Sequence, residues 1–252
     1  MTQMSLKDRL AGRSGFVVLA ELTGGPGFSF DPIEKFLKAF GQAKKGAIPR
    51  GFDFAAITLP QSPGGVANVE PAGVIGFLQA NGLLAGLDVV PHVSCKDANL
   101  DGIISSLMGL RKMGASNILA LTGDKPVKAK GVFELESLGL LRLIQRINHE
   151  AYIQAKPQAL GEVPQFFAGA AVSPFKYTEA SQMQQYYKMG KKVASGAAFL
   201  ITQVGWDWRK SAELFTYLRE TGLNVPVIGN VYLLSTLTPA PVSYTHLRAH
   251  ET

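Results

Sequence analysis

The sequence of 252 residues contains a single cysteine, Cys95. One cysteine excludes an intramolecular disulfide framework and any zinc cluster built from several cysteines. Uncharged apolar runs of about 18 residues are also absent, so we expect no membrane-spanning helix. The first 15 residues are polar and lack the apolar segment of a secretion signal. These absences predict a cytoplasmic protein with no membrane partner.

Long blocks of like charge are absent as well, although the net charge is +6. Lysines and arginines are scattered along the chain, which argues against nucleic acid as a partner. A small anionic ligand, such as a cofactor that carries phosphate, accounts for the basic surplus more simply. Hydrophobic residues make up 46% and charged residues 17%, so the chain can bury a sizeable core.

Seven short apolar segments alternate with longer amphipathic segments. We expect strands at residues 16–21, 53–58, 87–92, 117–121, 166–172, 198–202 and 226–229, and helices at residues 32–44, 71–81, 100–113, 135–154, 179–195 and 209–221. Strict alternation of this kind indicates a parallel sheet with helical crossovers. The apolar runs are nearly continuous, as in strands that are buried on both faces.

Two α/β architectures fit this order, a (β/α)8 TIM-type barrel and a doubly wound open sheet. No G-x-G-x-x-G follows the first strand, which weakens the dinucleotide-binding open sheet. Polar residues stand where successive strands end, at Glu21, Thr58, His92, Asp124 and Gln203. In a barrel these ends converge on one face, where such enzymes keep their active sites. We therefore predict the barrel, without its last β/α unit because no eighth strand is visible before residue 241.

The final segment, residues 242–252, differs in character from the rest and follows the sequence TPAP at 238–241. It shows no period, and its back-translation can be written as a sequencing-adapter sequence. We expect one incomplete catalytic barrel domain at 1–241 and a non-native tail at 242–252, with a natural polar tail as the alternative. His246 and His250 fall in this tail, so their spacing does not predict a metal site.

Several motifs occur in a fixed order. PHVSCKDA occupies residues 91–98 and LALTGDKP residues 119–126; GVFELESLGLL (131–141), KKVASGA (191–197) and LITQ (200–203) follow. Together these segments resemble the methylenetetrahydrofolate reductase family, from about residue 15 to residue 240. The resemblance implies a flavin enzyme that binds FAD on the C-terminal face of a barrel. It also implies reduction of 5,10-methylenetetrahydrofolate to 5-methyltetrahydrofolate, a step in one-carbon metabolism and methionine biosynthesis.

The resemblance also assigns roles to residues of this chain. It implies that Glu21 and Asp124 are catalytic, that Gln203 and Asp124 bind the folate substrate, and that Thr58, His92, Thr122, Gly123, Asp124, Ser173 and Lys192 bind FAD. The electron donor would be a nicotinamide or a protein partner, and a homo-oligomer is compatible with the family. No metal is implied.

The residue types suit these roles, and each also has a structural alternative. Glu21 is the only acid in its apolar run, so desolvation would raise its pKa and let it donate a proton, unless a buried ion pair holds it. Asp124 would stabilise a folate cation and tune the flavin, or serve as a cap or turn residue. His92 could be a structural hydrogen bonder, and Lys192 a solvated lysine.

Two other functions remain open at this point. The first is a pterin-binding methyltransferase on the same barrel, which needs no flavin. The second is a non-catalytic subunit that binds folate or flavin and depends on a partner.

Overall fold

The structure, a computed structural model, describes residues 4–12, 16–25, 27–45, 51–84, 87–150 and 165–231. Its strands are β1 (Phe16–Glu21), β2 (Phe52–Leu59), β3 (Asp88–Ser94), β4 (Asn117–Leu121), β5 (Phe167–Val172), β6 (Phe199–Thr202) and β7 (Val227–Ile228). Its helices are α1 (Leu6–Gly12), α2 (Asp31–Lys45), the 3-10 turn η1 (Pro63–Gly65), α3 (Pro71–Ala80), α4 (Leu100–Lys112), α5 (Ser137–Glu150), α6 (Glu179–Ala194) and α7 (Trp208–Glu220).

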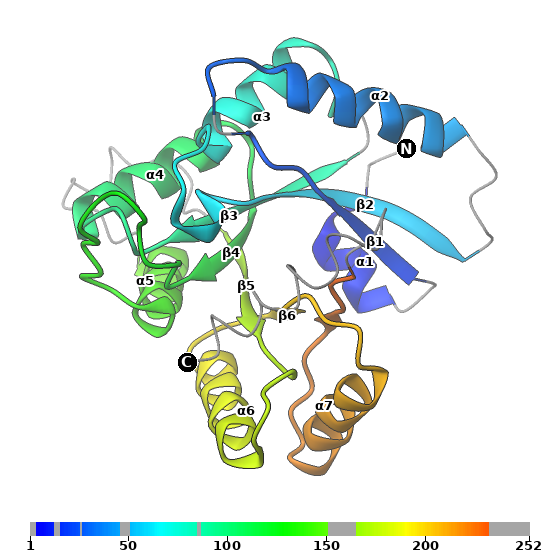
Figure 1. The fold of residues 1–252 in the computed structure, drawn as a ribbon, viewed down its shortest axis with the longest axis vertical. Coiled ribbons are helices and arrows are strands. Elements are labelled where there is room, and N and C mark those ends of the chain that lie inside the picture. Colours follow the sequence, from blue (N-terminus) through cyan, green and yellow to red (C-terminus); the bar gives the residue numbers. More distant parts are fainter. Residues whose placement is uncertain are drawn as a thin grey trace.

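The seven strands form one sheet in the order β1 to β7, and each strand runs parallel to the next. The sheet curves round into a nearly closed barrel with helices outside it (Figure 1). Among the described residues β1 and β7 are not paired, so a seam remains between these two edge strands. The predicted TIM-type barrel with seven units is thereby confirmed.

Most predicted elements begin and end within two residues of their observed bounds, and β1 and β4 match residue for residue. The predicted helix at 135–154 begins at Ser137 in the structure, and residues 151–154 lie outside the described part. The predicted tail at 242–252 also lies outside the described residues, so the proposed domain division stays a prediction. No helix in the described ranges has the length and apolar character needed to cross a bilayer.

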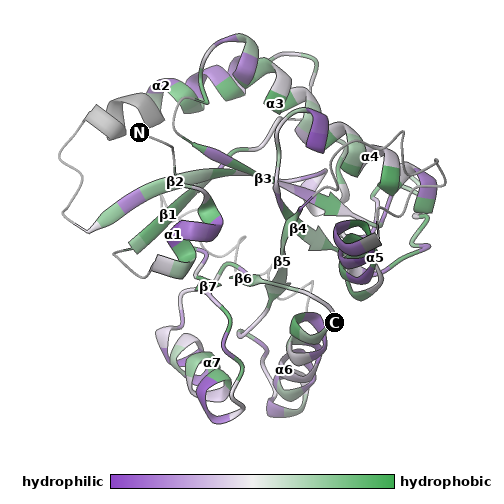
Figure 2. Cartoon of the chain, turned by 180° about the vertical axis from the view of Figure 1, so that it is seen from behind, coloured by the Kyte–Doolittle hydropathy of each residue, from purple (hydrophilic) through white to green (hydrophobic). Residues whose placement is uncertain are grey.

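Two buried clusters hold the barrel together. The larger one packs the outer face of the strands against the helices, whose surfaces mix hydrophobic and hydrophilic residues (Figure 2). The smaller one lies in the barrel interior and includes Leu119 and Phe199. The Phe199 ring needs the glycine opposite it, because a Cβ on Gly169 would lie 2.3 Å from that ring. The small residues of β5 therefore make room for the interior side chains of β6.

Helix α1 was not expected from the sequence. The Leu6 side chain is fully buried in the interior cluster, and the Leu6 amide donates to Asp88 Oδ2 at 2.6 Å. Arg9 forms an ion pair with Asp53 at the start of β2. These contacts place α1 at the N-terminal end of the strands, opposite the end that carries the predicted site. The helix has only seven residues and lies in a polar segment, so its apolar residues are too few to show a helical period.

Candidate functional site

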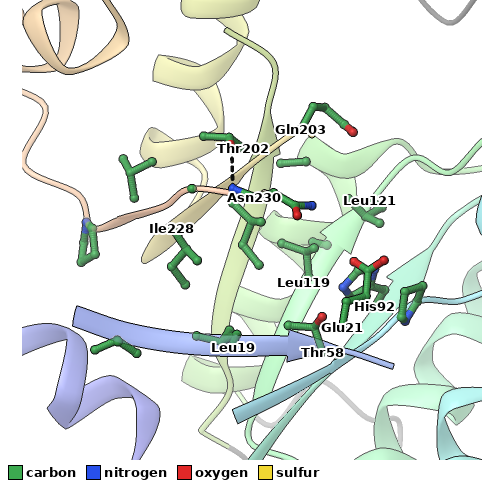
Figure 3. A pocket seen from close by; sticks show the side chains of 18 of the residues that line it. Leu19, Glu21, Thr58, His92, Leu119, Leu121, Thr202, Gln203, Ile228 and Asn230 are labelled. Atoms are coloured by element: carbon green, nitrogen blue, oxygen red, sulfur yellow. Dashed lines mark hydrogen bonds between the residues drawn. The ribbon is translucent and has the colours of Figure 1, made fainter. Parts of the chain in front are cut away.

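A cavity of about 1730 Å³ lies in the barrel, and residues of both edge strands, β1 and β7, line it. Most of its polar lining comes from the C-terminal ends of the strands (Figure 3), as expected for a barrel, whereas Arg9 and Asn224 line it from other parts of the fold. The predicted residues that line it are Glu21, Thr58, His92, Thr122, Gly123, Asp124, Lys192 and Gln203. The fold therefore brings eight of the nine predicted site residues into one cavity.

Ser173 is the exception, since it is not among the residues that line the cavity. Its carbonyl oxygen accepts a hydrogen bond from Gln182 Nε2 at 3.1 Å. Gln182 is buried, and its Oε1 accepts from the Lys176 amide at 2.9 Å. The buried side-chain amide of Gln182 thus holds the loop that contains Ser173. A contact between Ser173 and FAD stays a prediction.

Glu21 ends β1 in register with Thr58 of β2, and its side chain faces the cavity (Figure 3). The carboxylate is open to the cavity space, yet the surrounding walls desolvate it and raise its pKa above the ordinary value. No hydrogen bond or ion pair holds this carboxylate within the described part of the chain. The described residues therefore do not support the alternative that Glu21 is held in a buried ion pair.

His92 projects from β3 and is only 9% exposed. Its Nε2 atom is buried and has no hydrogen-bond partner among the described residues. Burial lowers the pKa of His92 to about 4, so the imidazole is neutral near pH 7. A buried ring nitrogen without a partner costs stability, which makes His92 a strong candidate for a ligand contact.

The Asp124 turn, residues 122–125, follows β4. Its first hydroxyl is already engaged, because Thr122 Oγ1 accepts from the Ser137 amide at the start of α5, at 3.0 Å. Gly123 has φ +90°, a conformation that favours glycine. Asp124 Oδ2 accepts from the Gly64 amide at 2.9 Å. The structural alternative for Asp124 thus holds for one carboxylate oxygen, while the residue still lines the cavity.

Lys192 reaches from α6 across the end of β5, where its Nζ donates to the Ala171 carbonyl at 2.7 Å. Desolvation lowers the pKa of Lys192, and nearby Lys188 lowers it further, against the opposing effect of Glu136. The side chain is half-buried at the cavity wall, unlike a solvated helix lysine. Its remaining ammonium protons are suited to an anionic group in the cavity.

Gln203 follows β6, and its amide nitrogen on the main chain donates to the Val172 carbonyl at 2.8 Å. The side chain is exposed to the cavity (Figure 3). An amide both donates and accepts, as recognition of a pterin edge requires.

Sequence reasoning missed several polar residues of the lining, among them Gln61, Ser94 and Asn230. Gln61 Oε1 accepts from the Ser94 amide at 2.7 Å and from Ser94 Oγ at 3.0 Å. The Asn230 amide donates to Thr202 Oγ1 at 2.9 Å (Figure 3). Each lies at a strand end or within two residues of one, so a wider window there would have included them. No group of three or more potential metal ligands occurs in the described ranges.

The sequence also matches a known protein family. The sequence pattern of the family described as methylenetetrahydrofolate reductase matches residues 75–240. The chain belongs to the methylenetetrahydrofolate reductase family. The match covers His92, Asp124, Lys192 and Gln203, whereas Glu21 and Thr58 precede it.

Individual members of the family are distant from this chain. It is 26% identical to methylenetetrahydrofolate reductase 1 of Schizosaccharomyces pombe over 67% of its own length and 26% of that protein. It is 22% identical to methylenetetrahydrofolate reductase (NADH) 1 of Arabidopsis thaliana over 59% of its length and 25% of that protein. The chain spans about a quarter of the length of the curated relatives it matches.

A solved structure shares the fold. It is that of an uncharacterized protein from Clostridium thermocellum that binds two copies of 5-methyl-5,6,7,8-tetrahydrofolic acid. The TM-score is 0.56 at 12% identity, over 89% of this chain and 68% of that one. At this identity the likeness concerns the fold alone.

Proposed function

We propose that this chain reduces 5,10-methylenetetrahydrofolate to 5-methyltetrahydrofolate, with FAD bound as the hydride carrier. Family membership and the cavity at the strand ends support this proposal. The electron donor, a nicotinamide or a protein partner, the cytoplasmic location and any self-association stay predictions.

The residues on the cavity wall fit FAD. The unpartnered Nε2 of His92 is suited to a polar edge of a flavin, and the Lys192 ammonium is suited to a phosphate. Gly123 lines the cavity and can present its main chain to a flat ring there, while the space where a side chain would stand is filled by Lys96. When bound, FAD would supply the capacity to accept a hydride from the donor and deliver it to the folate.

The remaining polar groups fit the folate. Gln203 can pair with the donor and acceptor atoms of the pterin edge. Burial raises the pKa of Glu21 and so favours its protonated form, which can give a proton to the folate nitrogen when the five-membered ring opens. Asp124 keeps one oxygen outside its bond to Gly64, and this negative charge stabilises the cationic form of the folate.

The observation that carries the proposal is Glu21, an acid of raised pKa in the cavity with no ion-pair partner among the described residues. We expect Glu21→Gln to leave flavin reduction by the electron donor intact. Reoxidation of the flavin by methylenetetrahydrofolate should slow by roughly 10²-fold or more, the usual share of a general acid. Stopped-flow traces of the two half-reactions measure this separately.

Glu34→Gln is the matched control, since Glu34 is exposed on α2 and does not line the cavity. Equal slowing of both half-reactions in Glu21→Gln would make Glu21 a structural acid and contradict the assignment.

A second candidate is folate binding without reduction, either in a flavin-free methyltransferase or in a partner-dependent subunit. Two observations favour it: the Thr122 hydroxyl and one Asp124 oxygen already serve structural hydrogen bonds. A purified protein that binds 5-methyltetrahydrofolate but shows no flavin absorbance and retains no added FAD would support this candidate over the reductase.

A further inference from the structure

The Asp124 turn is held between two other loops that also leave the C-terminal ends of strands. On one side lies the turn after β2. The Gly64 amide donates to Asp124 Oδ2 at 2.9 Å, and the Val127 amide donates to the Gly65 carbonyl at 3.1 Å. Contact there is close, because a Cβ on Gly65 would lie 2.2 Å from the Lys125 carbonyl oxygen. Two rungs of hydrogen bonds thus tie residues 64–65 to residues 124–127.

On the other side lies Lys96, two residues beyond the end of β3. It is only 2% exposed, and it is not among the residues that line the cavity. A Cβ on Gly123 would lie 3.0 Å from Cβ, Cγ and Cδ of Lys96, so the aliphatic chain of this lysine covers Gly123 directly. The Lys96 carbonyl also accepts from the Val132 amide at 2.7 Å, at the far end of the same loop.

The ammonium group of Lys96 has a different role from its aliphatic chain. It forms an ion pair with the half-exposed carboxylate of Asp97. That pair gives the buried ammonium a partly exposed partner of opposite charge, while the methylene groups pack inside. The packing against Gly123 therefore depends on the aliphatic chain, and the ion pair only satisfies the charge at its end.

We propose that Lys96 is a positioning residue for Asp124: its buried aliphatic chain holds the Asp124 turn against Gly64, which fixes one carboxylate oxygen and sets the direction of the other. The effect of this position of Asp124 on catalysis rests on the function proposed above. The mechanical part, a turn held between Lys96 and Gly64, does not depend on any ligand.

Three variants separate the aliphatic chain from the charge. Lys96→Ala removes the chain that covers Gly123, Lys96→Met keeps most of it without the charge, and Asp97→Asn removes only the partner charge. In flavin-free protein, hydrogen exchange of the Gly64 amide reports on its bond to Asp124. We expect exchange to be at least about tenfold faster in Lys96→Ala, the factor expected when a hydrogen bond to a charged group is lost. Lys96→Met and Asp97→Asn should exchange like the parent.

A second measurement separates positioning from general stability. The midpoint potential of bound flavin is measured in the parent, Lys96→Ala, Asp124→Asn and the double variant. Lys96→Ala should shift the potential by half or more of the shift in Asp124→Asn, and should add nothing in the double variant. A merely structural lysine would lower stability without this dependence on Asp124.

The outcomes are distinct for the two proposals. Unchanged Gly64 exchange in Lys96→Ala overturns the positioning role, whatever the flavin results show. Equal acceleration in Lys96→Ala and Lys96→Met assigns the effect to the charge and also overturns it. If the parent retains no flavin, the reductase proposal fails, and the exchange measurement alone decides whether Lys96 holds the turn.

Discussion

Acidification should destabilise this protein through His92, because the folded state holds that imidazole neutral. Its pKa is lowered to about 4 by burial, whereas a histidine in the unfolded chain titrates near 6.5. Between these two values the unfolded state binds a proton that the folded state does not. The contribution of His92 to stability is therefore fully present above about pH 6.5 and is lost as the pH falls toward 4.

The magnitude follows from the difference in pKa. One pKa unit corresponds to about 1.4 kcal/mol, so the drop from 6.5 to about 4 corresponds to roughly 3 kcal/mol in total. Somewhat more than half of that, roughly 2 kcal/mol, should be lost between about pH 7 and about pH 5. The residue is 9% exposed, so little solvent screening reduces the figure.

Urea unfolding at about pH 7 and about pH 5 measures this loss in the parent and in His92→Gln, which keeps a polar side chain but does not titrate. The loss on acidification should be smaller in the variant by roughly 2 kcal/mol. His149→Gln is the control, because His149 is exposed on α5 and should leave the parent's dependence unchanged. Parallel loss in the parent and in His92→Gln would refute the reasoning, since His92 would then be hydrated or paired in the folded state.

Two further predictions concern the flavin. Lys192→Met should weaken FAD binding at least about tenfold, as expected for a charge-assisted hydrogen bond, with the exposed neighbour Lys191→Met as control; an unchanged dissociation constant in a fluorescence titration would count against a phosphate contact. Asp124→Asn removes a negative charge beside the cavity, so the flavin potential should rise while folate reduction slows. Potentiometry and stopped-flow absorbance test this pair of effects, and a potential that stays constant would place Asp124 away from the flavin.

The fold could be predicted from the sequence because the elements that make it up have strong local patterns. Nearly continuous apolar runs gave β1 and β4 their bounds directly, although only β4 is mostly buried, since β1 is an edge strand. Helix α1 could not be predicted, since its role depends on Leu6 reaching a barrel interior formed by strands far along the chain. Its stabilising partner Asp88 is 82 residues away, a separation that no local window contains.

The site was predictable as a set of residues but not as a set of interactions. The polar residues at the strand ends identified His92 and Asp124. They did not show that His92 Nε2 has no hydrogen-bond partner among the described residues, or that Asp124 accepts a hydrogen bond from Gly64. Those facts depend on how loops from different strands meet above the barrel. Lys96 shows the limit most clearly, because a lysine in a polar motif resembles a surface residue until the packing against Gly123 is known.

Glu21 lies outside the family match, and the register of the sheet connects it to the matched region. The family match begins at residue 75, so it cannot by itself assign a role to a residue on β1. The sheet supplies the connection: Glu21 is in register with Thr58, and β2 in turn pairs with β3, which carries His92 into the matched region. Parallel neighbours end at the same end of the barrel, so Glu21 lies beside the matched strands, and its side chain lines the cavity that they enclose. Its raised pKa is explained by that position, and the half-reactions of Glu21→Gln test the catalytic role proposed for it.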